Sequence, residues 1–287
     1  MRRRTGSWHL LTYLLAACTA STVPQPGQPI PSPSLPNPAP ISSAAGPWTF
    51  NYAPGTIAYQ ISRTAGIESQ PDSGSHRETS TNTTHELLTL ELTEDTIHFT
   101  AIIDTSSTIT QGAIGPVQSV SVPVQLSGSF IGDSLIFSGD SIPEKCNPVS
   151  SILLADLHNL LLRFPIQLSQ GSSWRDSVEL TGCQGMIPTT AHIARSYIVS
   201  REAAYQGEPV LLVQRTDSIH AHGEGAQQQH HVTLEAGGTG SAIYYLSPTS
   251  GRVVRIDTGQ DLDLAITVSG KIHHFKQSSK EEFNLGR

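Results

Sequence analysis

Apolar residues recur at every second position along most of this chain, and this period constrains the fold more than any other feature of the sequence. Leucines alternate with polar residues over 88–92, and after Glu94-Asp95 the alternation resumes over 97–104. Successive side chains of a β-strand point to opposite faces, so the pattern predicts a hairpin with one apolar face and one wetter face. The same period returns over 120–126, where Pro123 indicates an edge or a bulge.

The C-terminal part of the chain repeats this pattern between recognisable turns. Turn-forming residues stand at Gln206-Gly207, at Ser247-Pro248 with Gly251, and at Ser269-Gly270. Charged residues make up 14% of the chain, against about 25% in an ordinary soluble domain, and Ser, Thr, Gly and Gln fill the polar positions. That composition suits strands better than helix surfaces. Strands are expected near 190–200, 208–219, 241–247, 252–256, 261–269 and 271–276.

One segment departs from the period of two. Residues 151–162 carry five leucines at the i, i+3, i+4 and i+7 spacing of a helix, with Pro148 before them and Pro165 after them. We expect one amphipathic helix at about 150–162. Its polar positions, Asp156, His158 and Asn159, lack the lysines and arginines of a membrane-surface helix, so packing against the sheet is the better interpretation. It separates two strand blocks, at about 48–145 and 166–287.

The N-terminus has the features of an export signal. Three arginines at 2–4 precede a short apolar run, 8–15, which is too short to span a bilayer. Leu15-Ala16-Ala17-Cys18 resembles the lipobox of bacterial lipoproteins. This resemblance implies cleavage after residue 17 and a diacylglyceryl anchor, carrying fatty acids such as palmitate, on Cys18. A secretory signal without lipidation is the alternative. Thr19 is not the aspartate that retains lipoproteins at the inner membrane of enteric bacteria, which favours the outer membrane.

Residues 18–47 then form the lipidated N-terminus and a tether, and 48–287 form the β-rich domain. Nine of the 29 residues from Thr19 to Pro47 are proline, which favours an extended polyproline segment reaching about 90 Å. Without residues 1–17 the chain loses three arginines and no acids, so its formal net charge changes from −7 to −10. This charge argues against nucleic acid as a partner.

Two cysteines remain after lipidation, Cys146 and Cys183. In an oxidising compartment such a pair is most simply a disulfide, and a metal pair is the alternative, although neither residue belongs to a Cys-x-x-Cys motif. The loop it closes would have about 37 residues.

The second strand block contains motifs that resemble a group of exported bacterial β-proteins. A proline-containing segment leads to a glycine and a tryptophan, and a glycine-rich strand precedes a turn and another strand. Such proteins are similar to the curved antiparallel sheets of envelope lipoprotein carriers and lipid-binding lipoproteins. The resemblance implies an open half-barrel with the helix on or near its concave face. The motifs are Phe164-Pro165-Ile166-Gln167-Leu168, Gly171-Ser172-Ser173-Trp174-Arg175, Gly238–Leu246 and Gly251-Arg252-Val253-Val254.

Gly132-Asp133-Ser134-Leu135 matches the nucleophile block of the esterase family named after these four letters, and Asp217-Ser218-Ile219-His220 matches its acid-and-base block. The match implies Ser134 as nucleophile, His220 as base and Asp217 as its orienting acid. The flanking apolar residues favour instead a β-hairpin with a two-residue turn, and the alternating helices of that family are missing. We therefore expect no enzyme activity, with the esterase as the alternative.

Several histidines could hold zinc or copper. His220 and His222 would share one face of a strand, and His230-His231 follow closely. The competing interpretation is a solvated hairpin tip, because Gly223, Gly225 and Gln227–Gln229 surround them. No cofactor is expected. The leading hypothesis is a lipid-anchored protein of the bacterial envelope that binds a lipid, another apolar or amphipathic molecule, or another envelope protein. Seven aromatic residues would line its cavity or fill its core (Trp48, Phe50, Tyr52, Tyr59, Trp174, Tyr244, Tyr245).

Overall fold

The computed structural model describes residues 47–70, 79–94, 98–111, 117–120, 123–131, 134–138, 148–184, 187–227 and 230–286. The signal segment, Cys18, the tether as far as residue 46, and Cys146 lie outside the described residues. Predictions on those positions therefore stay predictions.

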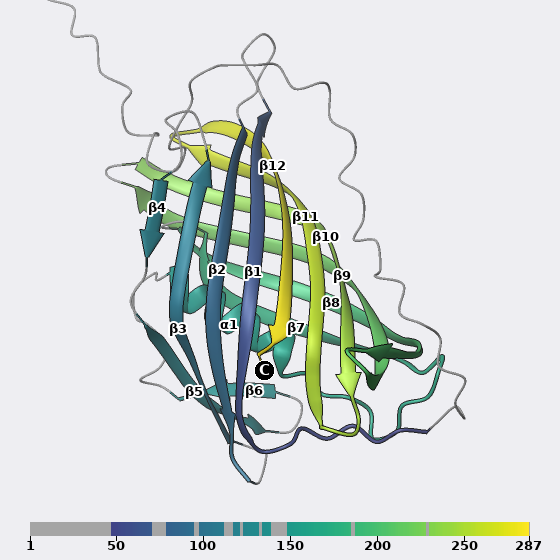
Figure 1. Ribbon diagram of the computed structural model, residues 1–287. Coiled ribbons are helices and arrows are strands. Elements are labelled where there is room, and N and C mark those ends of the chain that lie inside the picture. The colour runs from purple at the N-terminus through teal and green to yellow at the C-terminus, as the bar shows by residue number, and fades with distance from the viewer. Residues whose placement is uncertain are drawn as a thin grey trace, which may run out of the picture.

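The described residues form twelve strands and one helix (Figure 1). The hairpin predicted around Glu94-Asp95 is β2 and β3, and the predicted helix is α1, Pro148–Leu160. The strands are β1 Gly55–Gln70, β2 Thr79–Leu92, β3 His98–Gln111, β4 Val117–Val120, β5 Val124–Ile131, β6 Ser134–Phe137, β7 Ser173–Gln184, β8 Ile187–Tyr205, β9 Glu208–Gln227, β10 His230–Ser247, β11 Arg252–Val268 and β12 Lys271–Leu285.

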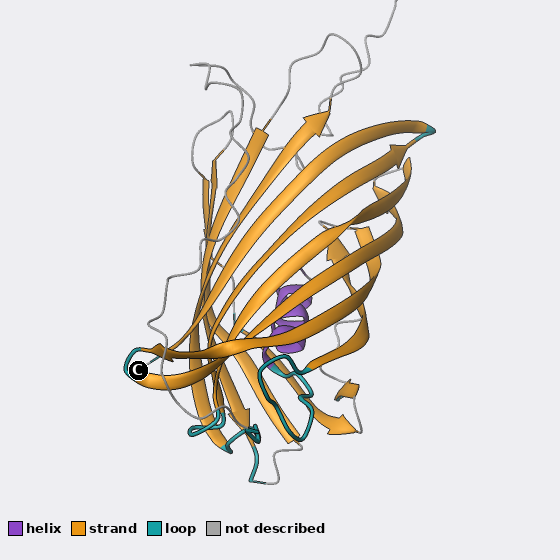
Figure 2. Ribbon diagram, turned by 90° about the vertical axis from the view of Figure 1, so that its right-hand side faces the viewer, coloured by secondary structure: helices purple, strands orange, loops and turns teal. Residues whose placement is uncertain are grey.

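The strands form one antiparallel sheet that does not close. Its order is β6-β5-β3-β2-β1-β12-β11-β10-β9-β8-β7, and β4 also pairs with β3. The sheet curves strongly across β8 to β11 (Figures 1 and 2). Gln184 Nε2 on β7 donates to Gln277 Oε1 on β12 at 3.1 Å, although these strands are five places apart in the sheet. The prediction of a curved antiparallel sheet with one helix is thus confirmed.

Two of the predicted turns have the backbone of tight hairpins. Gln206 and Gly207 have φ of 52° and 88°, and Ser269 and Gly270 have φ of 50° and 78°. Each pair connects strands whose flanking residues are directly paired. Positive φ at both central positions matches the twist of the strands, which explains why glycine occupies the second position of each turn.

Helix α1 lies inside the curve of the sheet (Figure 2), and we call the face that it contacts the inner face. It packs against β7 on one side and against β5 and β3 on the other, so it occupies the space between the two ends of the sheet. Leu153, Leu157 and Leu160 are 0–1% exposed and fill the inner face at this level. The concave face is therefore a filled core here.

The helix ends at Leu160, two residues before the predicted end. The N–H and C=O groups that would form the next helical hydrogen bond have other partners. In a continuing helix the Leu162 N–H would donate to the His158 carbonyl. Instead it donates to the Tyr52 hydroxyl at 2.8 Å, and the His158 carbonyl accepts from Arg195 at 3.1 Å. The same Tyr52 hydroxyl donates to the Leu160 carbonyl at 2.8 Å, which fixes the end of the helix to the segment before β1.

The seven aromatic residues are part of the packing, as the core interpretation expected, but they do not all share one core. Phe50, Tyr59 and Tyr244 are buried in the main cluster together with the leucines of α1. Tyr245, the neighbour of Tyr244, is buried in a separate small cluster with Tyr205. Adjacent residues of a strand face opposite sides of the sheet, so Tyr244 and Tyr245 pack in two different clusters.

One expectation about the chain between β9 and β10 is wrong. Gly223 and Gly225 lie inside β9, paired with Leu234 and Val232, and do not form a solvated tip. A Cβ on Gly223 would stand 2.7 Å from the carbonyl oxygen of Pro188. The glycine is therefore required by the close approach of β8 and does not mark a loop.

Candidate functional site

The residues of the esterase hypothesis are not brought together. Ser134 opens β6 and pairs with Ile131, so a hairpin with a two-residue connection replaces the strand-to-helix turn of an esterase nucleophile. Asp217 and His220 both belong to β9, but they are three residues apart and point to opposite faces. Asp217 is buried on the inner face with its Oδ1 2.9 Å from Arg215 Nε, whereas His220 lies on the outer face. Asp217 therefore cannot orient the His220 ring.

The four predicted histidines are exposed, and His220, His222 and His231 lie on the outer face of the sheet. His220 is directly opposite His192 of β8, and the His192 ring stacks on that of His222 at 6.1 Å between centroids. His231 Nε2 is 3.6 Å from Glu224 Oε1, and His230 Nδ1 contacts Ser269 Oγ at 2.7 Å. Within the described part of the chain, no three His, Cys, Asp or Glu side chains form a group that could hold a metal ion. The predicted His220, His222, His230, His231 set is thus not assembled.

Cys183, near the end of β7, is disulfide-bonded. Its predicted partner, Cys146, lies outside the described residues, so the pairing itself stays a prediction. The backbone beside it packs against the start of the helix, since a Cβ on Gly182 would lie 3.1 Å from the side chain of Ser151.

A layer of charged side chains crosses the inner face between the helix and the sheet. We call it the charge layer. Three arginines of the sheet, on β1, β8 and β9, point their donors at the helix, and three acceptors of α1 receive them. The sequence pattern indicates that Asp156, His158 and Asn159 form the polar side of the helix, but it does not indicate which residues of the sheet they contact. The layer consists of Arg63, Glu86, Asp156, Asp176, Arg195, Arg215, Asp217 and Glu281.

Arg63 is the centre of the most buried part of this layer. Its guanidinium donates to Glu281 at 2.6 Å, to Asp156 at 2.7 Å and to Glu86 at 2.9 Å. Glu86 also accepts from the Ser106 hydroxyl at 2.9 Å. One cation thus faces three carboxylates, and burial raises the pKa of Asp156 from its ordinary 3.8 to about 8, against the lowering effect of Arg63.

The other two arginines hold the last turn of the helix. Arg195 makes a two-pronged ion pair with Asp176 at 2.7 and 2.8 Å, and its remaining donor reaches the His158 carbonyl. Arg215 donates to Asn159 Oδ1 at 2.9 Å. Beside them lies a small cavity of about 120 Å³, bordered by Asn159, Arg195, Arg215 and other residues of the inner face, several of them apolar.

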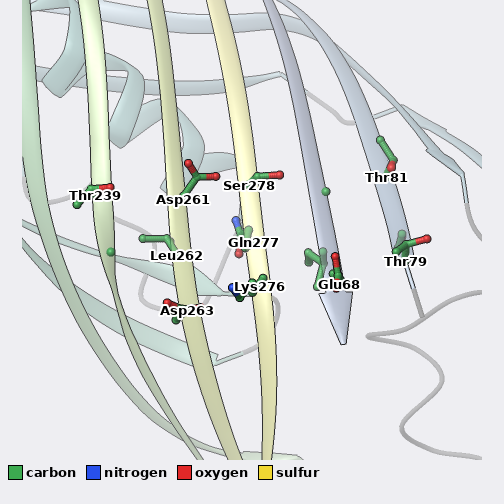
Figure 3. Close-up of a pocket in the computed structure, with 14 residues that line it drawn as sticks. Glu68, Thr79, Thr81, Thr239, Asp261, Leu262, Asp263, Lys276, Gln277 and Ser278 are labelled. Atoms are coloured by element: carbon green, nitrogen blue, oxygen red, sulfur yellow. The ribbon is translucent and has the colours of Figure 1, made fainter. Parts of the chain in front are cut away.

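The outer face of the sheet contains a hollow (Figure 3), which we call the outer groove. It has a volume of about 600 Å³ and crosses β2, β1, β12, β11 and β10. At about 4.8 Å between neighbouring strands, its length is roughly 19 Å. A row of short side chains, directly paired from strand to strand, crosses it: Thr81, Gly66, Ser278, Asp261 and Thr239.

A second row of paired residues runs beside the first and carries longer side chains. Glu68, Lys276 and Asp263 follow one another across β1, β12 and β11, as Figure 3 shows. With Asp261 the groove therefore contains three carboxylates and one ammonium group. None of the fourteen lining residues is aromatic. Such a surface suits a polar ligand that carries positive charge or many hydrogen-bond donors.

The outer groove could not be predicted from the sequence, because its lining residues come from five strands and form no local motif. Gly66, Asp261 and Ser278 come from three strands, and only the register of the β1–β12 and β11–β12 ladders makes them neighbours. The available signal was the combination of small and acidic residues on the exposed positions of these strands, which has no meaning without the register.

Comparisons with known proteins do not identify this chain. No family model matches it, and no curated protein matches it. Among solved structures it is similar to an outer membrane channel from Pseudomonas putida F1, at 6% identity and a TM-score of 0.30, over 85% of this chain and 100% of that one. A structure from work on the asymmetric conductivity of engineered proteins has 7% identity and a TM-score of 0.23, over 79% and 99%. Neither similarity is high enough to carry an argument.

No helix within the described ranges has both the length and the apolar character that crossing a bilayer requires.

Proposed function

We propose that this protein is a lipid-anchored, non-enzymatic binding protein of the bacterial envelope, and that it binds a basic segment of another envelope protein in the outer groove. The observation that carries the proposal is the contrast between the two faces of the sheet. At the level of α1 the inner face is filled by buried leucines, whereas the outer face has a 600 Å³ groove with three carboxylates.

An apolar ligand on the inner face, as in envelope lipid carriers, is the competing version. Such a ligand would have to replace Leu153, Leu157 and Leu160, whose burial contributes about 1.5–3 kcal/mol each. It would also have to break the contacts of the Tyr52 hydroxyl at the end of the helix. We therefore place binding on the outer face.

The groove is tested with a fluorescent hexalysine peptide as the probe for a basic segment. Replacing Glu68, Asp261 and Asp263 with their amides removes the three groove carboxylates, and binding is expected to weaken at least ten-fold at low salt. The matched control replaces three exposed carboxylates of the same face that do not line the groove, with an expected change of less than two-fold. These are Glu179, Glu224 and Glu235. Equal weakening in both variants would mean that only the net charge of the protein attracts the peptide.

Lipid attachment is a separate part of the proposal, motivated by the arginine triplet, the apolar run and the lipobox sequence at Cys18. Cells that express the full chain are grown with an alkyne fatty acid, and the protein is then labelled and fractionated. Label and membrane association are expected for the wild type and absent for Cys18→Ser. A Cys18→Ser protein that keeps the label would refute attachment at this cysteine.

A further inference from the structure

Helix α1 inserts one turn into the charge layer, and each polar group of that turn meets a different part of the sheet. Its Asp156 carboxylate faces three charged groups, Arg63 of β1, Glu86 of β2 and Glu281 of β12. The His158 carbonyl faces Arg195 of β8, which is paired with Asp176 of β7, and the His158 ring lies 6.0 Å from the ring of Phe137 on β6. The charged groups near His158 are Asp176 and Arg195, and Arg215 with Asp217 face the neighbouring Asn159.

The surroundings of Asp156 do not favour an ionised carboxylate. Its side chain is 1% exposed, and Oδ1 takes one of the donors of Arg63. No group among the described residues hydrogen-bonds to the buried Oδ2. The other donors of Arg63 already serve Glu86 and Glu281, so an ionised Asp156 would add a third negative charge around a single cation.

We propose that α1 docks on the sheet with a proton on Asp156, so that the helix is held less tightly as the solution becomes alkaline. The direction of this pH dependence follows from the direction in which docking shifts the pKa of Asp156. Because the pKa of Asp156 rises from 3.8 to about 8 in the docked state, docking takes up a proton between these values. From this group alone the docking equilibrium weakens about ten-fold for each pH unit in that interval, and it levels off above it.

His158 acts in the opposite direction at lower pH. Burial and then Arg195 lower the pKa of this imidazole from 6.5 to about 4, with Asp176 opposing them. The docked helix therefore releases a proton from His158, and docking strengthens about ten-fold per unit as the pH rises from 4 to 6.5. Between pH 4 and 6.5 the opposite effects of Asp156 and His158 on docking cancel. Between pH 6.5 and 8 Asp156 alone weakens docking by about 16-fold, because at pH 8 its carboxyl in the docked state is already half ionised.

Amide hydrogen exchange of α1 tests this, reported as protection factors, which already correct for the intrinsic pH dependence of exchange. Relative to Asp156→Asn, wild-type protection should fall about 16-fold from pH 6.5 to 8. In His158→Gln only Asp156 titrates, so protection should fall about 200-fold from pH 4 to 6.5, where that of the wild type stays nearly level. Asp263→Asn, an exposed carboxylate of the outer face, is the control and should follow the wild type.

A direct titration keeps the proposal falsifiable should a variant fold poorly. The side-chain carboxyl carbons of the wild-type protein are followed by NMR, and Asp156→Glu identifies the resonance. A midpoint above 7 is expected. A midpoint below 5, or equal pH dependence of α1 protection in the wild type and in Asp156→Asn, would overturn the proposal.

Discussion

Replacing Arg63 with methionine removes the cation at the centre of the charge layer and keeps most of the side-chain volume. Glu86 is left with its side chain 1% exposed and only the Ser106 hydroxyl as a donor, and Glu281 and Asp156 lose their donor too. Breaking a buried ion pair on one side costs about 3–5 kcal/mol, because the remaining charge is left unpaired. We expect a loss of this size in the free energy of unfolding at pH 7.5, measured by urea denaturation with tryptophan fluorescence.

Two further results are expected for Arg63→Met. The loss should shrink at pH 5, where the unpaired carboxylates can take up protons, and adding Glu86→Gln should restore part of the stability. The matched control is Arg175→Met on the exposed positions of β7, with an expected change within about 0.5 kcal/mol. A loss below about 1 kcal/mol for Arg63→Met, unchanged by pH and by Glu86→Gln, would refute the claim that Arg63 neutralises a buried acidic cluster.

Four other variants test the packing, each measured by urea denaturation. Leu157→Ala removes a fully buried side chain under the sheet and should cost about 2–5 kcal/mol; a loss below 1 kcal/mol would mean that α1 is not part of the core. Tyr52→Phe removes the hydroxyl that ends the helix and should cost about 1–3 kcal/mol, with faster exchange of the last amides of α1 as the local readout. Gly223→Ala should destabilise the protein by about 1–3 kcal/mol, because its Cβ would collide with the Pro188 carbonyl. Gly66→Ala is the control and should be tolerated, because its Cβ would have only ordinary contacts. Equal effects of the two variants would contradict the register of β8 and β9.

The strands that could be predicted were those whose buried and exposed sides differ clearly in polarity. The leucines of β2 and the residues of β12 near Ser269-Gly270 belong to this class, and the structure has strands and turns there. The strands nevertheless extend further than predicted. β9 runs to Gln227 through Gly223, Glu224 and Gly225, where composition indicates a loop. The pairing of β9 with β8 and β10 overrides local propensity in such segments.

The candidate site was less predictable than the fold. Asp156 and His158 were identified as the polar side of a helix, but their partners come from strands far away in the chain, and Arg63 and Glu281 are 218 residues apart. A short motif such as Gly132-Asp133-Ser134-Leu135 is visible without the fold, yet its serine begins a strand that pairs with the strand before it. Local patterns therefore indicate local structure, and sites built across a sheet need its register.

The ladder between β1 and β12 determines when the sheet can be completed as the chain is synthesised. Each of these two strands lies at one extremity of the domain, and they pair along their length from Tyr59–Leu285 to Gln70–His274. The strands before α1 and those after it are joined within the sheet only through this ladder. Emergence from the N-terminus onward therefore leaves β1 with an open hydrogen-bonding edge until the final fifteen-residue strand arrives. A chain that stops before β12 lacks the strand that pairs with both β1 and β11, so the two parts of the sheet stay unjoined and each keeps an unpaired edge of the kind that promotes aggregation.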